Sequence, residues 1–167
     1  MSELSSPKTT SEQNSCATHV ALLAPVPLKH LIDGQEACEK RHHHTVAFGS
    51  MNWGLFEKLE ALRGMLCIDV FIYASRSDEL THTATWHARY VGRAEALADG
   101  THPRGERYRP ESCAGEAGWA IYWEVMDLKR LDPPIPLSDF RALESGENYK
   151  PTYLPEGPVL IEHPGAR

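Results

Sequence analysis

The stretch from Val46 to Ser75, VAFGSMNWGLFEKLEALRGMLCIDVFIYAS, constrains the fold more than any other part of the chain. Its middle carries apolar residues at the 3.6-residue period of an amphipathic helix, at Leu55, Phe56, Leu59 and Leu62. Ser50 or Asn52 can cap the start of this helix, and Gly64 stops it. Apolar runs precede and follow the helix. The stretch therefore predicts a strand, a turn, a short helix and a second strand.

The second of these strands, from Ile68 to Ala74, is apolar on both faces apart from Asp69. That pattern is typical of a central strand covered on both sides. We expect Asp69 near the start of the strand, paired with an arginine. Thr85 to Ala96 alternates well enough to predict a long strand, with a bulge or a close backbone approach at Gly92.

The remaining segments complete an α+β pattern. Strands are expected at 19–24, 45–48, 119–128 and 159–162, and prolines interrupt the chain at 133, 134 and 136. One or two helical turns are expected at 27–32, closed by Gly34, and a short helix from Ser138 to Leu143. Because strands come in runs, we predict a mixed or antiparallel, partly closed sheet of five or six strands with two or three short helices.

The length of 167 residues suits one domain with its own core. We expect that domain at 19–163, between a flexible, Ser/Thr-rich tail at 1–18 and a short C-terminal tail at 164–167. No window approaches the roughly 20 apolar residues of a membrane span, and the first residues lack the pattern of a secretory signal. We therefore expect no membrane partner.

The four cysteines, at 16, 38, 67 and 113, form no close pair. A disulfide framework is not expected in an unsignalled chain of this size. We interpret Cys67, inside an apolar run, as a small buried hydrophobe and place Cys16 in the tail. These assignments predict a cytoplasmic protein.

The net charge of −6 argues against a protein that grips long duplexes through their phosphates. It leaves room for a small pocket with a locally basic rim. Trp53 stands beside Ser50 and Asn52 in the predicted turn, and an aromatic ring next to short hydrogen-bonding side chains suits a flat, polar group such as a nucleobase. Alternatively, Trp53 packs the helix start onto the sheet and Asn52 only caps the helix.

The order of these segments resembles the EVE domain of the PUA-like superfamily, which is related to the YTH and ASCH domains. Five stretches carry the resemblance, and they span about residues 20 to 145: LLAPVP, FGSMNWGLFEKL, IDVFIYAS, WHARYVGRAEA and WEVMDLKRLDPPIPLSDFRAL. Met51 and Ala74 stand where the family often has Arg and His. The resemblance implies a pseudobarrel with a pocket between the first strand, the Asn-aromatic turn and the end of the central strand.

In such domains the pocket typically accepts a modified base flipped out of DNA or RNA, and this function needs no catalysis or cofactor. The ligand-binding residues that we predict are Ser50, Asn52, Trp53, Tyr73, Ser75 and, beside a long loop at 99–118, Trp119. The predicted phosphate contacts are Arg76, Arg89, Lys40 and Arg41. Tyr73 on a central strand and Trp119 in a β-prone segment could instead belong to the core.

The histidines at 42, 43 and 44 invite a metal site with Cys38 and Glu39. Three adjacent side chains on an extended segment cannot all face one ion, and the spacing fits no standard zinc arrangement. We therefore predict a solvated loop here and no metal site. Alternatively, the histidines form a basic rim for phosphate together with Lys40 and Arg41.

Two other classes of function stay open. One is an RNA- or amide-cleaving enzyme of the ASCH type, with Lys40 or Asp69 reaching the pocket. Convergent titratable groups in the cavity would favour it, although the chain has no GxSxG, P-loop or HExxH motif. The other is a protein-interaction module, which an exposed apolar patch away from the pocket would favour.

Overall fold

A computed structural model describes residues 16–17, 19–40, 44–78, 81–113, 115–116 and 118–166. The predicted N-terminal tail lies outside the described residues, except for Cys16 and Ala17. Six strands form one sheet: β1 (Val20–Pro27), β2 (Thr45–Ser50), β3 (Ile68–Ser75), β4 (Thr83–Glu95), β5 (Ile121–Pro136) and β6 (Val159–Glu162). Two helices join them: α1 (Leu28–Lys40) and α2 (Trp53–Arg63). The α+β class with a mixed sheet is confirmed.

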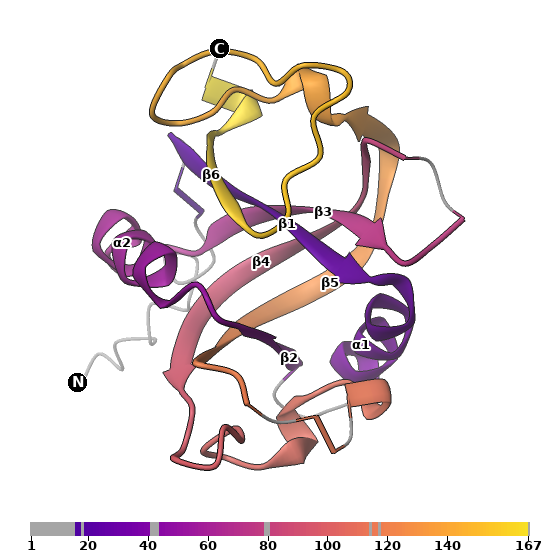
Figure 1. The fold of residues 1–167 in the computed structure, drawn as a ribbon, viewed down its shortest axis with the longest axis vertical. Coiled ribbons are helices and arrows are strands. Elements are labelled where there is room, and N and C mark those ends of the chain that lie inside the picture. Colours follow the sequence, from indigo (N-terminus) through magenta and orange to yellow (C-terminus); the bar gives the residue numbers. More distant parts are fainter. Residues whose placement is uncertain are drawn as a thin grey trace, which may run out of the picture.

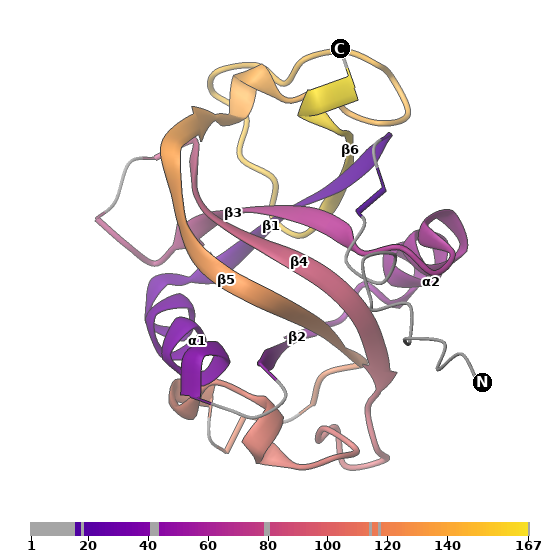
Figure 2. The ribbon, with the colours of Figure 1, turned by 180° about the vertical axis from the view of Figure 1, so that it is seen from behind.

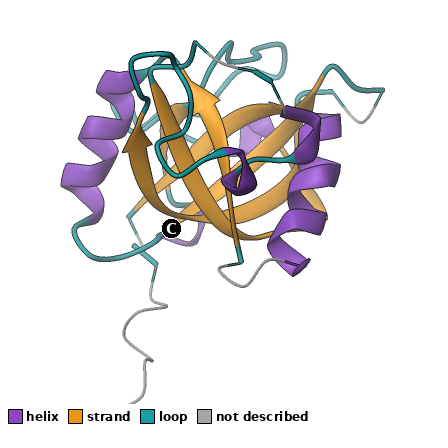
Figure 3. Ribbon diagram, turned by 90° about the horizontal axis from the view of Figure 1, so that it is seen from below, coloured by secondary structure: helices purple, strands orange, loops and turns teal. Residues whose placement is uncertain are grey.

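The strands follow the order β2-β5-β4-β3-β1-β6. β1 and β3 run parallel, and every other neighbouring pair among the described strands is antiparallel. The sheet curves strongly, and the two helices lie at opposite sides of it (Figures 1 and 3). Helix α2 crosses from β2 to β3, so it returns the chain to the far half of the same sheet.

The main core lies on one face of the curved sheet, and side chains from both helices join it. It joins alternate residues of five strands to α1 and α2, among them Leu22, Phe48, Phe56, Val70, Trp86 and Trp123. A second, smaller cluster lies on the other face of β1 and β3 and includes Leu23, Phe71, Leu137, Phe140 and Ile161. The segment after β5 covers this second face (Figure 2). Both faces of β3 are therefore buried, as its sequence predicts.

Helix α2 begins and ends as expected. The Asn52 side chain accepts a hydrogen bond from the backbone N–H of Leu55 at 3.3 Å, and Gly64 follows the last turn with a φ of 58°. Phe56 and Leu59 are fully buried on its inner face. The predicted bulge also lies where expected, because the register between β4 and β5 shifts between Tyr90 and Gly92.

Helix α1 is longer than predicted and runs straight through Gly34. A Cβ atom at this position would lie 3.0 Å from Leu128 and 3.4 Å from Phe48. Gly34 is thus a point of close packing between α1 and the sheet, not the end of a helix. Tertiary packing offsets the roughly 1 kcal/mol that a helical glycine costs.

Two further expectations after β5 were wrong. β5 continues through its three prolines to Pro136, still paired with β4. β2 pairs only with residues 121–126 of β5, so beyond them β5 has an unpaired side on which proline is tolerated. The expected helix from Ser138 is a single 3-10 turn, Leu137–Asp139, and its last residue is followed by extended backbone at Phe140.

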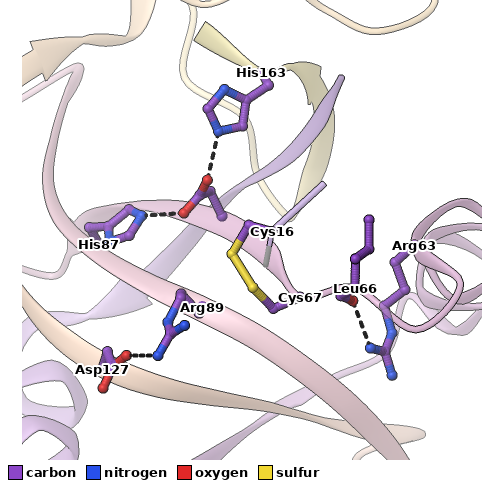
Figure 4. Close-up of a disulfide and its surroundings, with 9 residues drawn as sticks. Cys16, Arg63, Leu66, Cys67, His87, Arg89, Asp127 and His163 are labelled. Carbon is purple, nitrogen blue, oxygen red and sulfur yellow. Dashed lines mark hydrogen bonds and ion pairs between the residues drawn. A yellow bond between two sulfur atoms is a disulfide. The ribbon is translucent and has the colours of Figure 1, made fainter. Parts of the chain in front are cut away.

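The expectation of no disulfide was also wrong: Cys67 is buried as expected, but it forms a disulfide with Cys16 (Figure 4). The backbone N–H of Ala17 donates to the carbonyl of Cys67 at 2.9 Å, so the residues before β1 are tied to the start of β3. The spacing of 51 residues gave no sign of this pair. Only the fold brings the two residues together.

Among the described residues, the partners of Asp69 are two histidines and not an arginine. Its carboxylate oxygens accept from His87 at 2.9 Å and from His163 at 2.6 Å (Figure 4). Burial by itself raises the pKa of Asp69, but the two histidine hydrogen bonds outweigh burial and hold that pKa below its usual value. The bonds tie β4 and the residue after β6 to β3. Within the part of the chain that the structure describes, no helix is long and apolar enough to cross a membrane.

Candidate functional site

A pocket of about 670 Å³ lies where β1 and β3 end, beside the last residues of β2 and the start of α1. The chain beyond the second 3-10 segment (Glu111–Cys113) and the segment at 154–157 complete its wall. Six of the residues predicted to bind a ligand or phosphate line it: Ser50, Asn52, Tyr73, Ser75, Arg76 and Trp119. They come from three segments that are distant in the sequence.

The turn after β2 is held by its own side chains. The Ser50 hydroxyl accepts from the backbone N–H of Asn52 at 3.0 Å, and Asn52 in turn caps α2. Asn52 thus does cap the helix, which was the alternative to a role in ligand binding. Its carbonyl oxygen serves the helix, and the donors of its amide nitrogen are the groups that it can offer to a ligand.

Trp119 packs against the backbone of β2. A Cβ atom at Gly49 would overlap the ring atoms of the Trp119 indole, so the ring lies directly over this glycine. The backbone N–H of Ala120 donates to the Ser50 carbonyl at 3.1 Å and fixes the preceding residue beside the turn. The indole Nε1 is buried and has no hydrogen-bond partner among the described residues.

Tyr73, Ser75 and Arg76 lie at the end of β3. The Tyr73 hydroxyl donates to the carbonyl of Pro155 and so ties the segment 154–157 to the sheet. Burial raises the pKa of this phenol. Tyr73 therefore holds one wall of the pocket in place. Arg76 is exposed at the pocket edge, with a φ of 49° that is uncommon for a residue other than glycine.

Another part of the pocket lining carries a cluster of titratable side chains: His30, Arg109, Cys113 and Glu116. Arg109 is 4% exposed and Cys113 1% exposed. Burial, followed by the charge of Arg109, lowers the pKa of His30 against the opposing effect of Glu116. Burial also raises the pKa of the Cys113 thiol to about 11. The sequence analysis missed this cluster, because residue 30 lies far from residues 109–116 and no motif links them.

A buried network organises the segment that carries this wall. The His102 ring bonds the Glu124 carboxylate at 3.2 Å, and Arg104 forms an ion pair with the same carboxylate. Tyr122 donates to the carbonyl of Gly100 at 2.6 Å. The predicted long loop is therefore held against β5. Desolvation, with the charges of two arginines, lowers the pKa of His102 to about 4.

Three predicted site residues lie away from the pocket, and a fourth is not described. Trp53 is 44% exposed and is absent from the pocket lining, with the Arg93 guanidinium 5.8 Å from its ring centroid. Arg89 pairs with Asp127 of β5, and Lys40 pairs with Glu36 on the exposed side of α1. Arg41 lies outside the described residues.

The histidine run is only partly described. Residues 42 and 43 lie outside the described residues, and the Nδ1 of His44 bonds the carbonyl of Cys38 at 3.0 Å. Lys40 and Asp69, named above for an enzyme of the ASCH type, do not line the pocket.

Comparisons of this chain with protein-family models, with curated proteins and with solved structures found no match.

Proposed function

We propose that the pocket binds a nucleobase or a nucleotide-like group, stacked on Trp119 and held at its polar edge by the turn at Ser50 and Asn52. Arg76 at the pocket edge would meet a phosphate. We further propose that the curved sheet is a pseudobarrel of the PUA-like type and that the domain is of the EVE kind. The mixed six-stranded sheet, the parallel pair β1 and β3 and the flanking helices are compatible with that class.

The position of Trp119 carries the proposal. One face of its ring lies over Gly49, while the residue lines a pocket large enough for a nucleotide-sized ligand. Its buried Nε1 donor meets no acceptor from the described residues, and an unsatisfied buried donor costs about 1–3 kcal/mol. The edge of a base supplies acceptors together with a flat face for stacking. Stacking on the indole is therefore the contact that we expect a bound base to make.

The test compares two tryptophans. The wild type, Trp119→Ala, Trp119→Phe and the matched control Trp53→Ala are titrated with nucleoside monophosphates and with single-stranded oligonucleotides, with and without modified bases. Loss of a stacked ring removes about 1–3 kcal/mol, roughly a 5- to 150-fold change in affinity. We expect this loss in Trp119→Ala, a smaller one in Trp119→Phe, and wild-type affinity in Trp53→Ala.

Circular dichroism of each variant separates loss of binding from loss of the fold. If no probe binds the wild type, or if both tryptophan-to-alanine variants bind as tightly as the wild type, the pocket proposal is wrong. A parallel comparison of Arg76→Gln with Arg89→Gln tests the phosphate contact, because Arg89 pairs with Asp127 and does not line the pocket.

One observation favours the enzyme as a second candidate. Titratable groups converge on one wall of the pocket, at His30, Arg109, Cys113 and Glu116. Incubation of single-stranded RNA and simple amides with the chain, followed by chromatography, tests this candidate. Turnover by the wild type that is lower in Glu116→Gln would support the enzyme. Recovery of intact RNA and amides would contradict it.

The interaction module and the cytoplasmic location stay predictions. Exposed apolar side chains do lie at the end of α2, away from the pocket, at Leu62, Met65 and Leu66. The disulfide between Cys16 and Cys67 argues against a cytoplasmic location, because such bonds persist mainly in oxidising compartments.

A further inference from the structure

Three side chains of different chemistry meet in the lining of the pocket. The imidazole of His30, the thiol of Cys113 and the carboxylate of Glu116 each place one ligand atom within 4.8 Å of the other two. His30 lies in the first turns of α1, Cys113 in a 3-10 segment and Glu116 just beyond it. Nitrogen, sulfur and oxygen donors of these types are the ligands that zinc takes in proteins.

The existing spacing is close to that of a tetrahedral site. With Zn–S near 2.3 Å and Zn–N or Zn–O near 2.0–2.1 Å, neighbouring ligand atoms lie about 3.4–3.6 Å apart. The His30 Nε2 and the Glu116 Oε1 are already 3.6 Å apart. Because the ligand atoms of the three residues lie within 4.8 Å of one another, the Cys113 thiol has to approach by about 1.4 Å at most to complete a three-ligand site.

The histidine is oriented as a metal ligand requires. Its other ring nitrogen, Nδ1, bonds the Ser112 hydroxyl at 2.7 Å, which directs Nε2 towards Glu116. The backbone N–H of Ser112 donates to the Asp33 carboxylate of α1 at 3.1 Å. The segment that carries the thiol is thus fixed to the helix that carries the imidazole. Outer partners of this kind fix ring orientation in metal sites.

The two oxygens of the Glu116 carboxylate contact different neighbours. Its Oε1 faces His30, and its Oε2 lies 3.8 Å from the Arg109 guanidinium. Arg109 also donates to the backbone carbonyl of Glu116 at 3.3 Å. One oxygen can therefore bind an ion while the other keeps its arginine contact, an outer interaction that ligating carboxylates commonly have.

We propose that His30 Nε2, the Cys113 thiolate and Glu116 Oε1 form a site for one divalent cation of the zinc class. Three protein ligands leave a fourth position for water or a ligand group, as in catalytic zinc sites. All three residues line the pocket, so that position is accessible from the cavity. The thiolate selects against Mg²⁺ and Ca²⁺, which take oxygen ligands. The site goes beyond base binding and does not depend on it.

The test uses Co²⁺ and Zn²⁺ with the full chain after treatment with a chelator. Cobalt bound through a thiolate gives a charge-transfer band, so the spectrum reports the sulfur ligand directly. We expect one Co²⁺ per chain with this band, and its displacement by one equivalent of Zn²⁺. Cys113→Ser should abolish the band and weaken binding at least tenfold. Ser112→Ala should weaken binding by about 10–100-fold while keeping the band.

Cys38→Ser is the matched control, because Cys38 is the other buried cysteine outside the disulfide among the described residues and does not line the pocket. The triple variant His42→Gln, His43→Gln and His44→Gln controls for metal that is bound by the histidine run. Both controls should keep the band, and Zn²⁺ should raise the melting temperature of the wild type but not of Cys113→Ser. Absence of bound metal, a band that survives in Cys113→Ser, or a band lost in either control would overturn the proposal.

Discussion

At the scale of single residues, the pocket depends on a contact between a glycine and a tryptophan. The Trp119 ring lies where a side chain at position 49 would be, so Gly49 is needed for the close approach of ring and strand. The contact also fixes the plane of the ring along one wall of the pocket. A larger residue at position 49 changes the pocket without removing any group that would touch a ligand.

We therefore expect Gly49→Ala to displace the Trp119 ring. The fold should lose about 1–3 kcal/mol of unfolding free energy, the usual cost of overpacking, and nucleotide probes should bind less tightly. Denaturant unfolding and the same titrations measure both effects. Gly54→Ala is the control, because a Cβ atom there meets nothing within 4 Å and α2 gains a better helix former. Equal behaviour of the two variants would contradict the contact.

At the scale of elements, the segment between β4 and β5 carries one wall of the pocket and is held by buried polar groups. His102 is 3% exposed, stacks on Tyr108 with ring centroids 5.3 Å apart and bonds Glu124. Since Arg104 also pairs with Glu124, the carboxylate is already matched by a guanidinium. The imidazole is therefore held in its neutral form.

This network predicts a dependence of stability on pH. The pKa of His102 is 6.5 in its ordinary state and about 4 in the fold, so between these values the unfolded chain binds a proton that the folded chain excludes. Stability is then fullest above pH 6.5 and falls as the pH approaches 4, by up to about 3 kcal/mol from this group. Denaturant unfolding at pH 7.5, 6.5, 5.5 and 4.5 measures the decline.

A His102→Asn variant isolates this contribution, because it lacks the titrating group but keeps the other histidines. We expect it to be less stable than the wild type at pH 7.5 and to show a flatter dependence between pH 6.5 and 4. Parallel pH curves for the two proteins would show that His102 is not held neutral.

At the scale of the whole molecule, covalent and polar links gather distant parts of the chain at β3. The disulfide joins Cys16 to Cys67 at the start of this strand, and Asp69 bonds His87 of β4 and His163 after β6 (Figure 4). The first and last described segments are thus fastened to one central strand. The pocket lies at the opposite end of β3, so these links support it from a distance.

We expect the disulfide to stabilise the fold by about 2–4 kcal/mol. The cross-link joins residues 51 positions apart and so reduces the conformational entropy of the unfolded chain. Denaturant unfolding with and without reductant measures the difference. Cys16→Ser should match the reduced wild type and should not respond to reductant. A thiol titration of the unfolded, unreduced chain should find two thiols, at Cys38 and Cys113. Four thiols, or equal stability in both conditions, would contradict the bond.

The sequence by itself determined the parts of the fold that depend on local spacing. The helix at Trp53–Arg63 follows from the 3.6-residue period and its asparagine cap, and the central strand at Ile68–Ser75 follows from an apolar run. Both patterns extend over only a few residues, so the local sequence is enough to decide which element forms. The turn at Ser50 and Asn52 forms for the same reason, because its hydrogen bonds join residues that are two or three positions apart.

Only the tertiary structure decided which side chains share the pocket. The sequence favours Trp53 as the aromatic wall, with Trp119 as a further candidate, yet pairing of β2 with β5 places Trp119 over Gly49 and leaves Trp53 outside. The length of α1 and the meeting of His30 with Cys113 likewise depend on contacts across the sheet. Such contacts join residues far apart in the chain, and neither periodicity nor motif spacing carries information about them.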